Sequence, residues 1–292
     1  MHALIQGVIL GVLTGGVYAL MASGQTLIFG IMKVVNLAQG AMVIMGAYLA
    51  YQLFVSFGLD PFLAIPITTV VMFGLGVAVQ LLFLRPLRRD DKSELSLLVT
   101  FAVALLLEGV ISVTWKTNYR SINTSYANSS WTILGYQITV VRVWAFALSL
   151  LALGLLYLLL NRTRFGRAVR ATVQNPDSAR LLGVEPDRVA AFGFGLGAAT
   201  AAAAGSVYGL LYPFYSGSHY DLISRLLSIV VLGGLGSVGG AVIAAIVVST
   251  SSAVVASTIS PAWSEMTFFV ILILVLLVRP QGLFGTVGRG SL

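Results

Sequence analysis

The sequence contains no cysteine, and its only histidines, His2 and His219, lie far apart. A chain without cysteine forms no disulfide, and it offers neither a thiol nucleophile nor a thiolate ligand for a metal. Ser and Thr are plentiful, but no base and orienting group accompany them, so we expect no catalytic residue. We likewise expect no metal site and no cofactor bound by this chain.

Charged residues are also rare. Asp, Glu, Lys and Arg make up 9% of the chain, whereas hydrophobic residues make up 58%. A soluble domain carries about a quarter charged residues, because its surface faces water. The net charge of +7 does not indicate nucleic acid binding, because the basic residues lie at the ends of apolar stretches rather than on one face. The composition therefore excludes an ordinary soluble domain.

Long stretches without any charge indicate membrane-spanning helices, which need roughly 20 apolar residues each. We predict an all-α, polytopic transmembrane bundle of about eight spans, forming one domain over residues 1–292. The first span is expected to be a retained helix, since it lacks the charged n-region of a signal peptide. The predicted spans are Leu4–Phe29, Leu37–Phe57, Phe62–Leu84, Leu95–Thr114, Val143–Leu160, Val189–Tyr212 and Ala262–Val278, with one more unit, interrupted by glycines, between Ile223 and Ile259.

The positions of Lys and Arg predict the orientation, because cytoplasmic loops carry an excess of both. With these spans, most of the 17 basic residues fall on one side, which we assign to the cytoplasm. The loop from Lys116 to Arg142 then faces outward. The residues on the cytoplasmic side are Lys33, Arg85, Arg88, Arg89, Lys92, the six arginines between Arg162 and Arg188, Arg279 and Arg289.

Two glycine-containing regions interrupt the hydropathy pattern, one in each half of the chain. The first runs from Gly24 to Gly46, and the second, from Leu232 to Gly240, holds five glycines. Glycine costs about 1 kcal/mol per helix position relative to Ala, so we expect broken helices. Broken backbone at membrane depth must be buried in protein or line a cavity, and one break in each half is typical of transporters built from repeats. The alternative is that these glycines only let helices pack closely.

The segment 161–188 is the one extended polar stretch on the inner side. Asn175 precedes Pro176, as an N-cap precedes a proline at the first helical position. Gly183 suits the position just after a helix ends. We expect a short helix of about two turns that offers a small surface to a soluble partner; the alternative is a solvated basic loop that only fixes orientation.

Four motifs, in chain order, resemble the inner-membrane permeases of branched-chain amino acid ABC importers. They are FGIMKVVNLAQGA (29–41), GRAVRAT with A-x-L-L-G (166–172 and 179–183), VLGGLGSVGGA (231–241) and RPQGLFG (279–285). The resemblance implies a multi-pass protein of the bacterial inner membrane. It also implies three kinds of partner: a second permease subunit, identical or a longer relative, two cytoplasmic subunits that bind ATP, and an external substrate-binding protein. The residues implied in coupling to the ATPase are Gly166, Arg167, Arg170, Asn175, Ala179, Leu182 and Gly183.

The substrate implied is a branched-chain or other small amino acid. Similar sequences often carry His at the position of Gln39, and glutamine cannot titrate. Permeation of urea, amides or other small polar solutes therefore stays open. A stand-alone carrier driven by a gradient is the alternative from another class, but it has no need of a coupling helix.

Several polar residues are candidates for the substrate pathway. Thr14, Tyr18 and Gln25 share one face of the first span, while Asn36 and Gln39 lie one turn apart at the first break. Asn36 and Gln39 would either contact substrate or tie broken helix ends together. The glycines Gly233, Gly234 and Gly236 of the second break complete the candidate set.

Two charged residues need separate explanations. Glu108 lies deep in the fourth span, where an acidic residue needs a partner that the sequence does not name. Arg225 precedes the second break on the outer side. It either attracts a carboxylate or reaches to the membrane surface.

Overall fold

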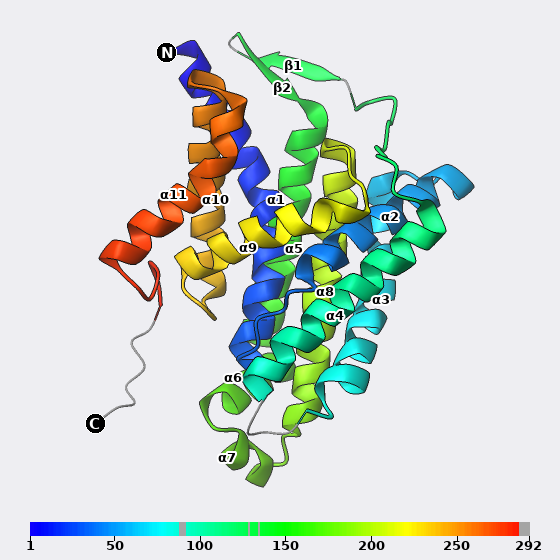
Figure 1. The fold of residues 1–292 in the computed structure, drawn as a ribbon, viewed down its shortest axis with the longest axis vertical. Coiled ribbons are helices and arrows are strands. Elements are labelled where there is room, and N and C mark those ends of the chain that lie inside the picture. The colour runs from blue at the N-terminus through cyan, green and yellow to red at the C-terminus, as the bar shows by residue number, and fades with distance from the viewer. Residues whose placement is uncertain (88–91, 128, 134, 286–292) are drawn as a thin grey trace.

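The computed structural model describes residues 1–87, 92–127, 129–133 and 135–285. Within these ranges, eight helices are long and apolar enough to cross a membrane, and they pack side by side (Figure 1). The prediction of an all-α bundle of about eight spans is confirmed, with boundaries that differ by a few residues. The spans are α1 His2–Met32, α2 Gln39–Phe57, α3 Pro61–Val79 with a π-helical continuation Gln80–Leu84, α4 Lys92–Trp115, α5 Val140–Arg162, α8 Pro186–Leu211, α10 Val238–Thr258 and α11 Pro261–Val278.

Shorter elements mark the two ends of the bundle. The antiparallel hairpin of β1 (Ser130–Ile133) and β2 (Tyr136–Thr139) lies at one end, and α6 (Arg164–Gln174) with α7 (Pro176–Leu181) lies at the other (Figure 1). The imidazole of His2 stacks on the ring of Tyr136, with centroids 4.4 Å apart. The N-terminus therefore lies at the hairpin end.

Asp60 anchors the loop that precedes the hairpin. Its carboxylate accepts hydrogen bonds from the amide of Phe62 at 2.9 Å and from the hydroxyl of Tyr126 at 2.6 Å. Burial and this carboxylate raise the pKa of Tyr126 above its usual value. Asp60 thus caps α3 and holds the outer loop against it.

The helix α8 forms the centre of the bundle and packs on α1, α2 and α3. Its small residues let neighbouring backbones approach closely. A Cβ added at Gly205 would collide with the carbonyl oxygen of Val43 in α2, and one at Gly46 would meet the backbone of Ala202 at 2.5 Å. Small residues also join α1 to α10, because Gly7, Gly11 and Gly15 lie directly against the α10 backbone.

The first break lies within the predicted region 24–46. The helix α1 continues through Gly24 and Gly30, and the interruption covers only residues 33–38. Lys33 ends α1 in the left-handed conformation at φ 58°. The break therefore contains Asn36, as predicted, and the glycines around it also serve close packing: a Cβ at Gly40, for example, would lie 2.5 Å from the carbonyl oxygen of His219.

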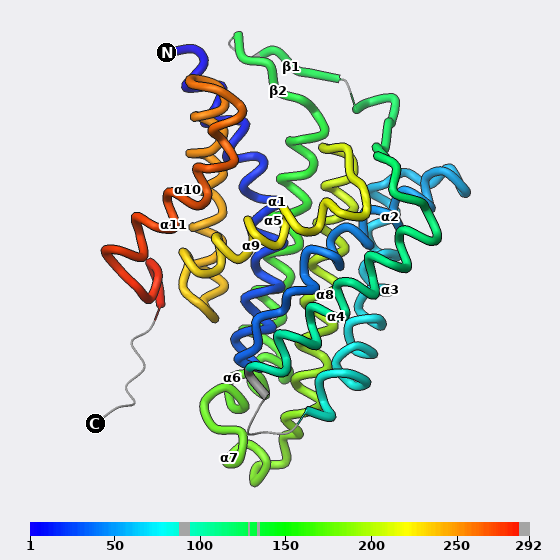
Figure 2. The backbone as a smooth tube through the Cα atoms, viewed as in Figure 1, coloured from blue at the N-terminus to red at the C-terminus, as the bar shows by residue number. Residues whose placement is uncertain are grey.

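The second break is confirmed. The helix α9 (His219–Gly233) ends at the glycine run, and α10 begins after residues 234–237. Gly234 and Gly236 have φ of 94° and 89°, which favour glycine. With 15 residues, α9 is shorter than a span requires. It crosses the bundle at mid-height between α8 and α10 (Figure 2).

The chain after α11 returns to this second break. The amide of Leu283 donates to the carbonyl oxygen of Leu232 at 2.8 Å, and a Cβ at Gly234 would collide with the backbone of Gly285. The motif 279–285 and the motif 231–241 are therefore one packed unit.

The basic residues follow the predicted distribution where the structure describes them. Lys33, Arg85 and Arg279 follow helices that run away from the hairpin end. Arg85 also lies 3.9 Å from Asp187, which ties the end of α3 to the start of α8. Arg88, Arg89 and Arg289 lie outside the described residues.

Candidate functional site

A cavity of about 410 Å³ opens in the half of the bundle that faces the hairpin. Its walls come from α1, α5 and the helices α8 to α11. Two of the candidate pathway residues, Thr14 and Tyr18, line it, together with Arg142, Arg225 and Glu265. The cavity (the outer cavity below) thus collects charges of both signs.

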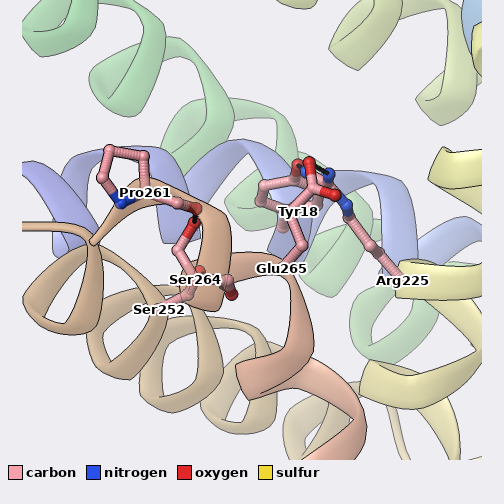
Figure 3. A network of polar contacts seen from close by, with 6 residues as sticks. All are labelled: Tyr18, Arg225, Ser252, Pro261, Ser264 and Glu265. Carbon is pink, nitrogen blue, oxygen red and sulfur yellow. Dashed lines mark hydrogen bonds and ion pairs between the residues drawn. The ribbon is translucent and has the colours of Figure 1, made fainter. Parts of the chain in front are cut away.

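Arg225 organises the polar side of the outer cavity. Its guanidinium donates to the hydroxyl of Tyr18 at 3.1 Å and to the carboxylate of Glu265 at 2.8 Å. It also lies 5.7 Å from the centroid of the Phe268 ring, in a cation–π contact. These contacts join α9, α1 and α11 (Figure 3).

Serine side chains close the cavity at the start of α11. The hydroxyl of Ser252 donates to the carbonyl oxygen of Ser264 at 2.8 Å, and the hydroxyl of Ser264 donates to that of Pro261 at 2.6 Å (Figure 3). The first turn of α11, which directly precedes Glu265, is thereby fixed to α10.

Asn36 and Gln39 lie away from the outer cavity and are fully buried. The amide of Gln39 donates to the carbonyl oxygens of Met21 at 3.4 Å and Gly197 at 3.2 Å, and it accepts from the amide of Asn36 at 3.2 Å. Gln39 thus ties the broken segment to α1 and α8, and Asn36 holds Gln39 in place, which is the structural role considered from the sequence.

Gln25 shares the helix of Thr14 and Tyr18 but not their cavity. Its side chain is 1% exposed, and its carbonyl oxygen has no hydrogen-bond partner among the described residues. One helix face therefore does not form a single polar stripe along the cavity.

A second, larger cavity of about 1050 Å³ opens at the other end (the inner cavity). It connects the second break to the coupling segment, because Gly236 lines it together with Gly166 and Arg170. Gly233 and Gly234 are buried instead, Gly233 against the start of α10 and Gly234 against the returning C-terminal motif.

The coupling segment is built as the sequence predicts. The side-chain oxygen of Asn175 accepts hydrogen bonds from the amides of Asp177 and Ser178, each at 3.0 Å, and Pro176 opens α7. Gly183 follows the end of the helix at φ 82°. The helix α7 has 6 residues, in agreement with the expected length of about two turns.

The other predicted coupling residues differ in their contacts and exposure. Arg170 donates to the carbonyl oxygen of Leu160 at 2.7 Å, and Gly166 packs on the same carbonyl, so both join α6 to the end of α5. Ala179 is the buried residue of α7 itself. Arg167, Leu182 and Gly183 are exposed.

Comparison with known proteins agrees with this architecture. Residues 7–276 match the family described as "Branched-chain amino acid transport system / permease component". The chain belongs to this family. As a member with eight apolar helices, this permease is a multi-pass protein of the inner membrane.

Three curated relatives cover nearly the whole permease. It is 28% identical to the high-affinity branched-chain amino acid transport system permease protein LivH of Escherichia coli, over 94% of this chain and 93% of the relative. It is 28% identical to BraD of Pseudomonas aeruginosa, over 96% and 95%. It is 29% identical to the probable branched-chain amino acid transport permease protein LivH of Methanocaldococcus jannaschii, over 91% and 88%.

The permease also has a polar cluster that the sequence pointed to only in part. Glu108 on α4 accepts a hydrogen bond from the hydroxyl of Tyr220 at 2.9 Å and lies 3.1 Å from the imidazole of His219. The sequence showed that Glu108 needed a partner, but His219 is more than a hundred positions away. Within the described ranges, no group of three or more His, Asp or Glu could hold a metal ion.

Proposed function

We propose that this chain is the membrane-spanning subunit of an ATP-driven importer that carries branched-chain or other small amino acids inward. The names of its curated relatives support this substrate class. The outer cavity supports it as well, because it presents cationic and anionic side chains to a small solute. The sequence has no G-x-x-x-x-G-K-[ST] loop, so the nucleotide would be bound by partner subunits.

The tip of α7 is the observation that carries the proposal. Leu181 and Leu182 are 89% and 81% exposed, although they lie in the most polar segment of the chain. Exposed apolar side chains framed by polar residues are typical of a surface that docks another protein. Each of the two ATP-binding subunits would cover this tip on one permease subunit.

The tip of α7 is linked through α6 to the membrane-spanning helix α5. Arg170 and Gly166 fix α6 to the end of α5, and α6 borders the inner cavity. A displacement of α7 by an ATPase would therefore be transmitted to the walls of that cavity and to the second break.

A second permease subunit would cover the polar face of α9. Tyr220, Asp221 and Ser224 are exposed on this helix, and Glu108 lies beside them. At membrane depth such groups face protein or water rather than lipid. The translocation pathway would then run between the two subunits along this face, whether the partner is identical or a longer relative.

The external binding protein would approach at the hairpin end. Trp131 in β1 is 49% exposed there, and the outer cavity lies in the same half of the bundle. Substrate released at this end would meet the outer cavity before it reaches the broken segments.

The test is isolation of the tagged chain from its native membrane, followed by identification of the proteins that accompany it. We expect an ATPase with a nucleotide-binding loop, and uptake of radiolabelled leucine into proteoliposomes only when ATP is supplied on the ATPase side. Recovery of the chain alone, with uptake that needs an ion gradient but no ATP, would contradict the proposal.

A further inference from the structure

The outer cavity carries one more positive than negative side chain. Arg142, Arg225 and Glu265 line it, and Arg225 is already bound to Glu265. Arg142 makes no hydrogen bond or ion pair with any residue that the structure describes. Arg142 lies in the first turn of α5, at the hairpin end, and lines the cavity, so its guanidinium is available for an anionic group that enters from outside.

A buried hydroxyl in the same cavity also lacks a partner. Ser249 on α10 is 4% exposed, and its oxygen makes no hydrogen bond among the described residues. It lines the cavity with Arg142. Buried polar groups are almost always hydrogen-bonded, so this hydroxyl is free to form a hydrogen bond with a molecule in the cavity.

The anionic residue is also accessible. One carboxylate oxygen of Glu265 accepts from Arg225, and the side chain is 71% exposed. A carboxylate accepts several hydrogen bonds at once, so Glu265 can bind a cation without releasing Arg225. Apolar groups from Leu10, Ala253 and Phe268 complete the wall.

We propose that the outer cavity binds a free amino acid as its zwitterion, with the carboxylate on Arg142 and the ammonium group on Glu265. Ser249 donates a further hydrogen bond, and the apolar wall receives the side chain. The volume of about 410 Å³ lies in the range of small-molecule sites, roughly 300–1,000 Å³. This assignment rests on the proposed function, because it gives the same solute a place on the outer side of the permease.

The two charges make the site selective for zwitterions. Urea and simple amides carry neither charge, so they would leave Arg142 without an anionic partner and Glu265 with Arg225 as its only cation. A site built to bind a charged group rejects the analogue without it, because its own polar groups then lose their partners.

The experiment measures binding of radiolabelled L-leucine to the purified permease in lipid nanodiscs, without ATPase or binding protein. We expect competition by unlabelled leucine to be at least about tenfold stronger than competition by leucinamide, 4-methylpentanoate or urea, which lack one or both charges. Arg142→Gln and Glu265→Gln should each weaken leucine binding at least about tenfold, and Ser249→Ala by a few-fold. Arg162→Gln, at the opposite end of α5, is the matched control and should bind as the unaltered chain does.

Each variant is first checked by size-exclusion chromatography and by its thermal unfolding midpoint, so that loss of binding is not loss of fold. The site would be overturned if the unaltered chain bound no leucine at millimolar concentrations. Equal competition by urea or leucinamide would also overturn it, as would unchanged leucine binding in Arg142→Gln and Glu265→Gln. Detection by native mass spectrometry of an anionic lipid in the cavity that leucine does not displace would do the same. If the whole complex still imports leucine with ATP, the site proposal alone has failed; if it imports none, the proposed function has failed.

Discussion

The imidazole of His219 lies 3.1 Å from the carboxylate of Glu108 and joins the first residue of α9 to the outer half of α4. His219 is 2% exposed, whereas the Glu108 side chain is 25% exposed. The pair therefore fixes the start of a helix that does not itself span the membrane, and it leaves part of the carboxylate open toward the polar face of α9.

Removal of this carboxylate should destabilise the permease. We expect Glu108→Ala to lower the free energy of unfolding by about 1–3 kcal/mol, because it leaves the buried imidazole of His219 without its partner. Glu108→Gln keeps an oxygen for the Tyr220 hydroxyl and should cost less. The thermal unfolding midpoint in detergent measures the difference. The control is Glu94→Ala, at an exposed position of the same helix. Equal midpoints for Glu108→Ala, Glu108→Gln and Glu94→Ala would refute the role of the pair.

Two glycines of α3 provide a matched test of close helix packing. A Cβ at Gly76 would lie 2.6 Å from the Cβ of Ala198 in α8, whereas a Cβ at Gly74 meets no atom within 4 Å. We expect Gly76→Ala to destabilise the bundle by about 1–3 kcal/mol through overpacking. Gly74→Ala should be neutral or stabilise it by up to about 1 kcal/mol, since Ala favours the helix. Only Gly76→Ala should lower the unfolding midpoint, and a similar loss in both variants would contradict this account of the α3–α8 contact.

The number and limits of the spans could be predicted because hydropathy and bilayer thickness determine them locally. The caps of α7 were predictable for the same reason, since Asn175 and Gly183 act on backbone within a few residues. Such features depend on neighbours in sequence, so the sequence alone carries them.

The first break could be located near Asn36, but the role of the glycines around it could not be predicted, because glycine has two uses that a sequence does not separate. Gly24 is helical and faces Thr200 across a contact that only a missing Cβ permits, while the interruption itself begins at Lys33. The choice between breaking and packing depends on α8, which is distant in sequence.

The composition of the outer cavity could be predicted only in part. Tyr18 and Arg225 were identified separately, but Arg142 and Glu265 join them through tertiary packing of helices far apart in the chain. Ser249 carried no signal, because a single serine in an apolar helix is unremarkable until its missing partner is seen.

Substitution of the exposed leucines of α7 should separate docking from folding. We expect Leu181→Ser with Leu182→Ser to leave the amount of permease in the membrane unchanged, since both side chains are exposed. Recovery of the ATPase with the tagged chain should fall about tenfold or more. The reason is that the loss of an apolar anchor residue lowers the binding free energy of an interface by about 2 kcal/mol or more.

The control for docking is Val55→Ser with Phe57→Ser, which removes exposed apolar groups from the outer end of α2. Quantitative mass spectrometry of the purified complexes measures the ratio of ATPase to permease. Normal ratios in the α7 double variant would show that the ATPase binds elsewhere. Arg170→Glu is less informative, because it also breaks the hydrogen bond to Leu160 that joins α6 to α5.

The absence of native cysteine allows the polar face of α9 to be tested with a single introduced thiol. If that face meets a second permease subunit, Ser224→Cys should form a covalent link with it in the presence of a short bifunctional maleimide, provided that the partner is identical and presents the same residue. Val70→Cys, on an exposed apolar position of α3, should face lipid and give at most a minor product. Dimer bands from Ser224→Cys, quantified on denaturing gels against Val70→Cys, would place α9 at the interface of two identical chains. A dimer from Val70→Cys alone would place the interface on α3, and would leave the exposed Asp221 and Tyr220 facing water rather than a second subunit.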